Sequence, residues 1–180
     1  MSRSFGDPIW ESTQIDLPSR ILRLKGYDYA QSGAYFVTVC IQNQVCLLGE
    51  VVDGRIHPND AGLMIDDWWT KLPDKFPKIE IDASVVMPNH FHGIVMLSEN
   101  WAAKTTSLPD IMKWFKTMTT NHYIRAVKQQ DWESFDGQFW QRSYHDHIIR
   151  NEPDLNRIRE YIENNPARWE ADVNYSQRLK

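Results

Sequence analysis

The 180-residue sequence contains little cysteine, few glycines and no long apolar run. Its two cysteines, Cys40 and Cys46, are too few for a disulfide framework, so a reducing cytoplasm is the expected location. No run of about eighteen apolar residues occurs and the first residues lack an apolar signal core, so neither a membrane span nor secretion is expected. The eight glycines form no phosphate-binding, dinucleotide-binding or serine-hydrolase pattern, and no four-ligand zinc pattern occurs.

What is present is the composition of an ordinary globular protein, with 42% hydrophobic and 24% charged residues. The length suits one domain, which we expect over residues 20–180 after an irregular arm at residues 1–19. The formal net charge is −4, whereas nucleic-acid binders usually carry a basic surface. The charge is uneven: residues 1–100 hold 8 basic and 13 acidic side chains, and residues 101–180 hold 12 and 11. A surface for phosphate groups is therefore expected in the second half and in the basic stretch at 20–25.

Alternating apolar residues predict strands, because successive side chains of a strand point to opposite faces. Residues 34–42 form a predicted half-buried strand, and residues 45–52 are expected to pair with it and close on the turn Asp53-Gly54. The apolar face of the first strand consists of Tyr35, Val37, Val39 and Ile41.

A second pair of strands is predicted at residues 79–87 and 90–97, joined by the tight turn Pro88-Asn89. Every second residue from Ile79 to Met87 is apolar, and these five are expected on one face. Residues 138–149 are also expected to be extended.

Helical spacing of apolar residues predicts three helices. The first begins at Asn59 or Asp60 and runs to about Leu72, the longest opens at Ser107 with a capping box to Asp110, and the last runs from Glu152 to just before Pro166. Strands joined by tight turns and mixed with helices predict an α+β fold, in which helices pack on an antiparallel sheet.

Two histidines follow the turn in Met87-Pro88-Asn89-His90-Phe91-His92. Residues two apart on a strand point to the same face, so His90 and His92 can offer two imidazoles to one metal ion. Without a metal they would be two polar histidines on a sheet surface. His145 and His147 have the same spacing, and for this second pair structural hydrogen bonding is the preferred interpretation.

The last helix places a tyrosine and an amide on one side, because Tyr161 and Asn165 are four residues apart. A tyrosine hydroxyl becomes a useful nucleophile where a metal assists the reaction. The alternative is that Tyr161 is a core aromatic and Asn165 an ordinary residue at the helix end.

The longest helix has basic side chains away from its apolar stripe, and such a face can follow a phosphate backbone or simply be solvated. Trp114 and Tyr123 lie among these charges and could stack on bases or belong to the core. The basic residues are Lys113, Lys116, Arg125 and Lys128.

Two motifs together resemble the REP-associated tyrosine transposases, relatives of the single-tyrosine transposases of small bacterial insertion sequences. One is Met87–His92 (MPNHFH) and the other is Tyr161–Pro166 (YIENNP). Either motif alone is a weak signal, and their combination is specific. The similarity spans most of the chain, with further matching stretches at 23–29, 33–38, 93–94, 115–116 and 139–150.

The resemblance implies a ferredoxin-like fold and an enzyme that cuts and rejoins single-stranded DNA next to hairpins, here repetitive extragenic palindromes. It implies that His90, His92 and Asn165 hold Mg²⁺ or Mn²⁺. Tyr161 would attack a backbone phosphorus and remain attached through a 5′-phosphotyrosine bond, so no nucleotide cofactor is needed. Tyr144, which also neighbours histidines, is the competing nucleophile.

DNA contacts are expected from basic and imidazole side chains in both halves of the chain, and the oligomeric state, monomer or homodimer, stays open. Two other functions remain. One is a hairpin-binding protein without catalysis, and the other is a hydrolase with both histidine pairs around one ion. The expected DNA-binding residues are Arg23, Lys25, Lys113, Lys116, Arg142, His145, His147 and Arg150.

Overall fold

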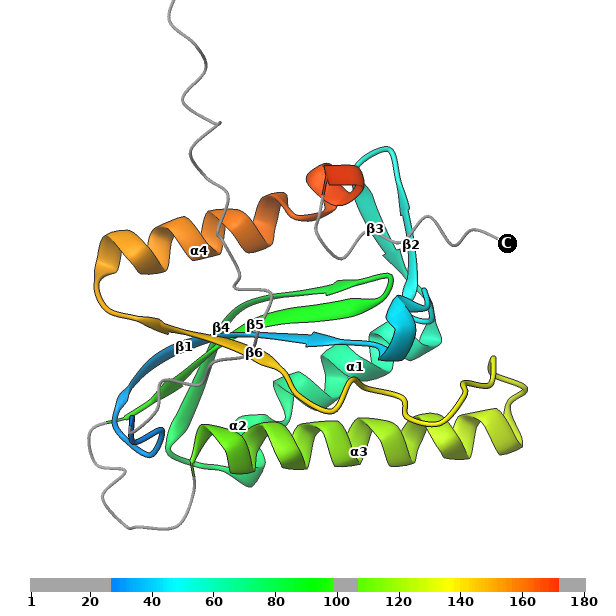
Figure 1. Cartoon of the computed structure of the whole chain (residues 1–180), viewed down its shortest axis with the longest axis horizontal. Helices are drawn as coiled ribbons and strands as arrows, with labels where there is room; N and C mark the ends of the chain where they lie inside the picture. Colours follow the sequence, from blue (N-terminus) through cyan, green and yellow to red (C-terminus); the bar gives the residue numbers. More distant parts are fainter. Residues whose placement is uncertain (1–26, 99–106, 172–180) are drawn as a thin grey trace, which may run out of the picture.

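The computed structural model describes residues 27–98 and 107–171, so the expected arm at residues 1–19 lies outside the described residues. Its main sheet has four antiparallel strands in the order β4-β5-β1-β6. Helices α1 (Asp60–Thr70) and α3 (Leu108–Gln129) alternate with these strands in the ferredoxin-like order β-α-β-β-α-β (Figure 1). The expected α+β class is confirmed. The strands are β1 (Gly33–Cys40), β4 (Ile79–Met87), β5 (His90–Leu97) and β6 (His145–Ile149).

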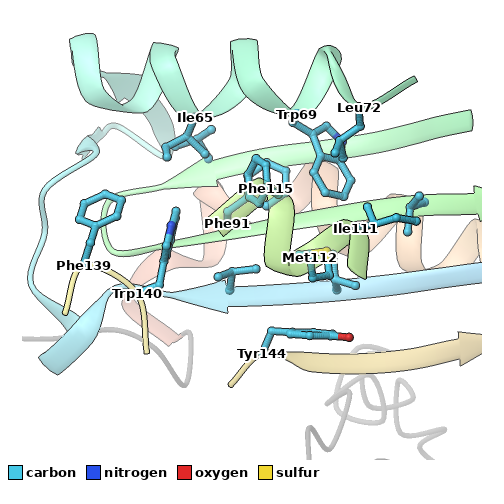
Figure 2. Close-up of a cluster of buried hydrophobic side chains, with 14 of the residues drawn as sticks. Ile65, Trp69, Leu72, Phe91, Ile111, Met112, Phe115, Phe139, Trp140 and Tyr144 are labelled. Carbon is cyan, nitrogen blue, oxygen red and sulfur yellow. The ribbon is translucent and has the colours of Figure 1, made fainter. Parts of the chain in front are cut away.

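Helices cover both faces of this sheet. Helices α1, α2 (Leu72–Lys75) and α3 lie against one face, and α4 (Glu152–Asn164) lies against the other (Figure 1). The larger core, on the α1/α3 face, packs Trp69 and Phe115 around Phe91 of β5 (Figure 2). The smaller core lies under α4 and is made of Phe36, Ile94, Ile149, Leu155, Ile158 and Ile162.

The expectation of a half-buried first strand is wrong, because β1 is central in the sheet and both of its faces are covered. Val37 and Val39 point into the larger core as predicted. Phe36 and Thr38 point to the opposite face, and each is only 1% exposed because α4 closes that side. A strand covered on both faces needs no polar face, but its residues give no local sign of which helix covers which side.

The predicted pairing of residues 45–52 with the first strand is also wrong. The chain leaves the sheet after Ile41 through the short 3₁₀ segment η2 (Gln42–Gln44), where Asn43 and Gln44 have φ of 58° and 55°. Strand β2 (Gly49–Val52) then pairs with β3 (Arg55–Pro58) in a separate two-stranded sheet. The predicted Asp53-Gly54 turn therefore joins β2 to β3, with φ of 49° and 70° as a tight hairpin requires.

Strand β4 does not keep one apolar face along its length. Its pairing with β5 shifts between Ile81 and Ser84, which marks a β-bulge. As a result Ile79 and Ile81 pack against the larger core, whereas Ala83 and Val85 pack against the smaller one. The extra residue reverses the alternation, so the prediction of a single face fails at this bulge.

The helix starts agree with the predicted caps. Asn59 accepts a hydrogen bond from the Gly62 backbone N–H (3.0 Å), and Ser107 forms the expected capping box with Asp110. The extended segment 138–149 is shorter than predicted, since only β6 pairs regularly and Trp140 forms an isolated bridge with Ile41. No helix within the described ranges has the length and apolar character needed to cross a membrane.

Candidate active site

His90 and His92 lie on the face of β5 that α4 covers, while Phe91 points into the larger core. This alternation is the one predicted from the sequence. Both imidazoles are fully buried, and their Nε2 atoms are 3.0 Å apart. Thr38, the partner of His92 in the β1–β5 register, places its hydroxyl 2.8 Å from His92 Nδ1.

The hydrogen bonds around His90 define its tautomer. The Asn89 amide nitrogen donates to the Gln44 carbonyl (3.1 Å), so the amide oxygen faces His90 Nδ1 at 2.8 Å. An amide oxygen only accepts, so Nδ1 of His90 carries a proton, and in the neutral ring Nε2 then carries a lone pair. With His90 in this neutral form, the Nε2–H of His92 donates to that lone pair and the Thr38 hydroxyl donates to His92 Nδ1.

Burial keeps His92 neutral. It lowers the pKa of His92 well below its ordinary value, because water that would solvate an imidazolium is excluded, and the nearby His90 and His145 act in the same direction. A neutral imidazole is the form that binds a metal ion.

The distance between the two histidines is compatible with a pair of metal ligands. Adjacent ligands of a six-coordinate ion, each about 2.1 Å from it, are separated by roughly 3.0 Å, which matches the distance between the two Nε2 atoms. To bind an ion, His92 must move its proton to Nδ1. The Thr38 hydroxyl can then rotate and accept a hydrogen bond from the Nδ1–H of His92, since a hydroxyl both donates and accepts. The donor set therefore fits a divalent ion.

Side chains of α4 and of the 3₁₀ segment η4 (Pro166–Ala171) cover the two imidazoles. The ring of Tyr161 packs edge-on against His92 at 5.3 Å between centroids, and Trp169 lies 5.8 Å from His90. The chain thus passes over the pair from His92 to His90, and Asn165, 2% exposed, lies midway along this path. Tyr161 and the histidine pair are thus brought to one place, and Asn165 belongs to the covering segment between Tyr161 and Trp169.

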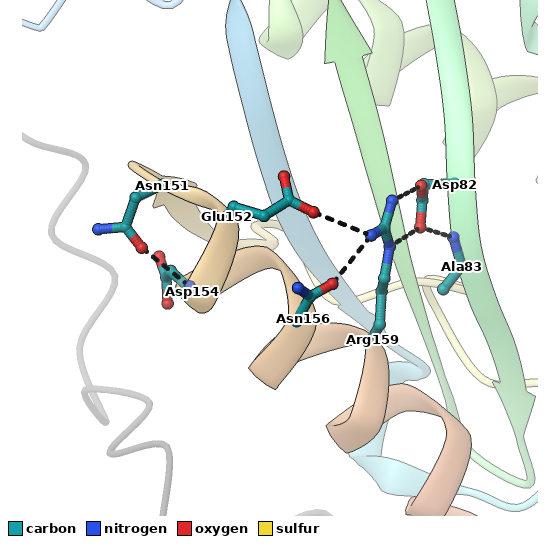
Figure 3. A network of polar contacts seen from close by, with 7 residues as sticks. All are labelled: Asp82, Ala83, Asn151, Glu152, Asp154, Asn156 and Arg159. Carbon is teal, nitrogen blue, oxygen red and sulfur yellow. Dashed lines mark hydrogen bonds and ion pairs between the residues drawn. The ribbon is translucent and has the colours of Figure 1, made fainter.

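Helix α4 is fixed over the sheet by an ion pair at the bulge of β4. Arg159, two residues before Tyr161, donates from Nε and Nη2 to the two carboxylate oxygens of Asp82 at 2.9 and 2.6 Å (Figure 3). Asn156 and Glu152 also face the guanidinium. The hydrogen bonds from Arg159 hold the pKa of Asp82 below its ordinary value, so the pair is charged near neutral pH.

Tyr144 lies on the opposite side of the sheet from the histidine pair. It is 5% exposed and belongs to the larger core with Phe139 and Trp140 (Figure 2). Its neighbour in sequence, His145 of β6, points to the opposite face and is the cross-strand partner of Thr38 on β1. The position of Tyr144 leaves Tyr161 as the tyrosine beside the histidines.

The alternative ion site with four histidines does not form. Among residues 27–98 and 107–171, no group of three or more His, Cys, Asp or Glu side chains could hold a metal ion. Strand β1 separates the pairs, so His145 lies two strands from His92, about 10 Å in a sheet. His147 instead bonds Asp154 at the start of α4 (2.9 Å), which is the structural role preferred for this residue from the sequence.

The expected DNA-binding residues are spread over several surfaces. Lys113, Arg142 and Arg150 are exposed, whereas Lys116 is half-buried and donates to the backbone carbonyls of Gln141 (2.7 Å) and Arg142 (3.1 Å). Arg23 and Lys25 lie outside the described residues.

Three contributors to the site were not predicted from the sequence. Thr38 and Asn89 orient the imidazoles, and Trp169 covers His90. The only local signal for Thr38 was its place between Phe36 and Cys40 on the face opposite the valines. Whether Thr38 contacts a histidine depends on the register between β1 and β5, which cannot be predicted from the residues of one strand.

Comparison with known proteins supports the resemblance inferred from the motifs. The chain is 37% identical to an uncharacterized protein of Haemophilus influenzae, over 87% of this chain and 92% of that protein. It is 22% identical, over 78% of this chain and 74% of the relative, to a Haemophilus influenzae protein whose name assigns it to the REP-associated tyrosine transposases. A solved structure of a REP-associated tyrosine transposase bound to a REP hairpin shares the fold, with a TM-score of 0.59, 24% identity, and coverage of 83% of this chain and 73% of that one.

The family assignment follows from a match to a profile described as "Transposase IS200 like". This match covers residues 72–165, more than half of the chain, and includes both the histidine pair of β5 and Tyr161 with Asn165 on α4. The chain therefore belongs to the family of IS200-like transposases.

Proposed function

We propose that this protein cuts and rejoins single-stranded DNA next to hairpins through a covalent bond to Tyr161. The observation that carries the proposal is the packing of the Tyr161 ring against His92, whose Nε2 meets that of His90 at 3.0 Å. In this proposal, α4 carries the nucleophile and β5 carries the pair of metal ligands beside it. The names of the similar REP-associated proteins supply the class of DNA.

The reaction conserves the energy of the DNA backbone. The Tyr161 oxygen loses its proton and bonds to a backbone phosphorus, while the bond from that phosphorus to the 3′ oxygen breaks. The 3′ oxygen takes up a proton and leaves as a hydroxyl, and the tyrosine keeps a 5′-phosphotyrosine bond. Attack by a 3′-hydroxyl on this bond reverses each change and joins two strands.

The residues around the nucleophile have separate roles in this proposal. His90, His92 and Asn165 would hold Mg²⁺ or Mn²⁺, which when bound offsets negative charge on the phosphate oxygens. Thr38 and Asn89 keep the imidazole rings oriented. Because both imidazoles are fully buried, a phosphate reaches them only when the covering ring of Tyr161 or Trp169 moves aside.

The test is a comparison of two tyrosine variants on labelled single-stranded hairpin DNA from repeats that flank the gene, with Mn²⁺ and a denaturing gel. Tyr161→Phe removes the proposed nucleophile, and Tyr144→Phe removes a matching hydroxyl on the opposite face of the sheet. We expect wild type and Tyr144→Phe to form a covalent protein–DNA band, and Tyr161→Phe to form none. A band that persists in Tyr161→Phe would refute the assignment of the nucleophile.

The same experiment distinguishes the two alternative functions, a hydrolase and a binding protein without catalysis. Cleavage without a covalent band would indicate a hydrolase with water as the nucleophile. Binding without cleavage, across both ions and several hairpins, would indicate a binding protein that lacks catalysis.

A further inference from the structure

The surface beside α3 contains two adjoining hollows that lie away from the histidine site. The first, about 520 Å³, lies between α3 and residues 135–144. The second, about 510 Å³, continues past Gln141 and Arg142, which line both hollows, to residues 42–44. We call the two together the α3 groove.

The described residues that line the α3 groove include no acidic side chain. Among residues 27–98 and 107–171, fourteen line the first hollow and six the second, two of them shared, and none of these is Asp or Glu. The chain as a whole has 24 acidic residues against 20 basic ones. Three cations and a set of amides line the groove instead, namely Lys113, Lys116 and Arg142 with Gln42, Asn43, Gln44, Asn121, Gln138 and Gln141.

The wall of the groove is held in place by backbone contacts. The Gln141 N–H donates to the Cys40 carbonyl (2.9 Å), which continues the edge of the sheet, and the Gln42 N–H donates to the Phe139 carbonyl (2.9 Å). Lys116 ties the same segment to α3 through the carbonyls of Gln141 and Arg142. These hydrogen bonds fix the backbone of this wall, which lowers the entropy cost of binding.

We infer that the α3 groove binds the unpaired strand next to the hairpin, an inference that rests on the proposed function. Lys113 and Arg142 suit the phosphates, and the amides of Asn121 and Gln138 suit base edges, since an amide both donates and accepts. Phe135, half-buried in the wall, offers a ring on which a base can stack. A concave surface receives splayed-out unpaired bases, whereas duplex bases are read by elements that protrude into a groove of the DNA.

The chain itself connects the groove to the histidine site. Arg142 and Ser143 line the groove, and two residues further His145 faces Thr38, whose other neighbour across the sheet is His92. A strand that leaves the groove over the edge strand β6 thus arrives on the α4 face. The groove would position the strand, and Tyr161 would act on it.

The experiment measures binding of labelled DNA by fluorescence anisotropy with the full chain in EDTA, so that no cleavage is needed. Two DNAs are compared, a blunt hairpin and the same hairpin with an unpaired extension. Lys113→Gln and Arg142→Gln each remove one groove charge, and the matched control Lys128→Gln removes one exposed charge from α3 outside the groove.

We expect each groove variant to weaken binding of the extended hairpin by about three- to tenfold. The slope of log affinity against log salt should fall by about 0.7, the value for one single-strand phosphate contact. The blunt hairpin should bind as in wild type, and Lys128→Gln should leave both affinities within about twofold. Asn121→Ala should alter the preference among bases in the extension.

Two results would overturn the inference. Equal weakening by Lys128→Gln would mean that α3 contributes only diffuse charge, and equal weakening of the blunt hairpin would place the duplex stem in the groove. Failure of the proposed function is detected separately, because it appears as the absence of the covalent band with Mn²⁺ and leaves the binding comparison intact.

Discussion

At the scale of single residues, the site depends on neutral imidazoles whose protons are directed by two neighbours. Asn89 can only accept from His90, whereas the Thr38 hydroxyl can donate to His92 or accept from it. The pair can therefore exchange a hydrogen bond with each other or present two lone pairs to an ion. When the pair binds an ion, the Thr38 hydroxyl must change from hydrogen-bond donor to acceptor.

The substitution Thr38→Val removes this hydroxyl and keeps the shape of the side chain. We expect the affinity for Mn²⁺ to fall by about tenfold, since outer-shell partners of a metal-binding histidine typically contribute that much. Isothermal titration calorimetry measures it. Thr119→Val is the control, because Thr119 is equally buried but bonds Trp140 in the other core. An unchanged affinity in Thr38→Val would show that the hydroxyl does not orient His92.

At the scale of elements, the position of Tyr161 depends on how α4 is attached to the sheet. The bulge of β4 places Asp82 opposite Arg159, and Asn151 caps the helix by accepting from the Asp154 N–H at 2.9 Å (Figure 3). Ile158 and Ile162 then pack against the sheet on either side of the tyrosine. One polar clamp and a short apolar stripe therefore determine which way Tyr161 points.

We predict that Asp82→Asn lowers Tm by roughly 1–3 °C at pH 7, because it removes the charged acceptor of Arg159. The folded-state pKa of Asp82 lies below its ordinary value of about 3.9, so its stabilising effect is present above that pH and is lost as pH falls through the lowered pKa. The Tm difference between variant and wild type should thus shrink as the pH falls below about 4. Thermal melts between pH 7 and pH 3 measure it.

The same variant tests whether the clamp positions the nucleophile. Formation of the covalent band should slow more than the small loss of Tm explains, and Arg159→Lys, which keeps the charge but loses the two-point contact, should show a similar slowing. A difference in Tm that stays constant down to pH 3 would contradict the assigned ion pair.

At the scale of the whole molecule, the larger core and the site lie on different faces of one sheet. The larger core, with Trp69, Phe91 and Phe115, lies between the sheet and helices α1 and α3, away from the histidines. We therefore expect the chain to fold without an ion at His90 and His92. Any ion bound there adds stability by mass action, because it binds the folded state preferentially.

We predict that EDTA leaves the far-UV circular dichroism spectrum unchanged and abolishes the covalent band. Added Mn²⁺ should raise Tm by several degrees once its concentration is about a hundredfold above the dissociation constant, and His90→Ala should remove this rise. Unfolding in EDTA would contradict the separation of core and site. A Tm rise that survives in His90→Ala would place the ion elsewhere.

Local patterns in the sequence were sufficient for several parts of this protein. The spacing of His90 and His92 places both on one face of a strand, and the spacing of Tyr161 and Asn165 places both on one side of a helix. The caps at Asn59 and Ser107 were predicted for the same reason. These properties depend on residues at most four apart, which share one regular element.

Only the tertiary structure decided which faces meet. It paired β2 with β3, reversed the face of β4 at the bulge, and put Tyr161 beside His92 while Tyr144 lies in the opposite core. It also added Thr38, which becomes part of the site through its register with His92. Each of these features depends on contacts between residues distant in sequence. The residues of a strand with two apolar faces do not indicate which helices pack against each face.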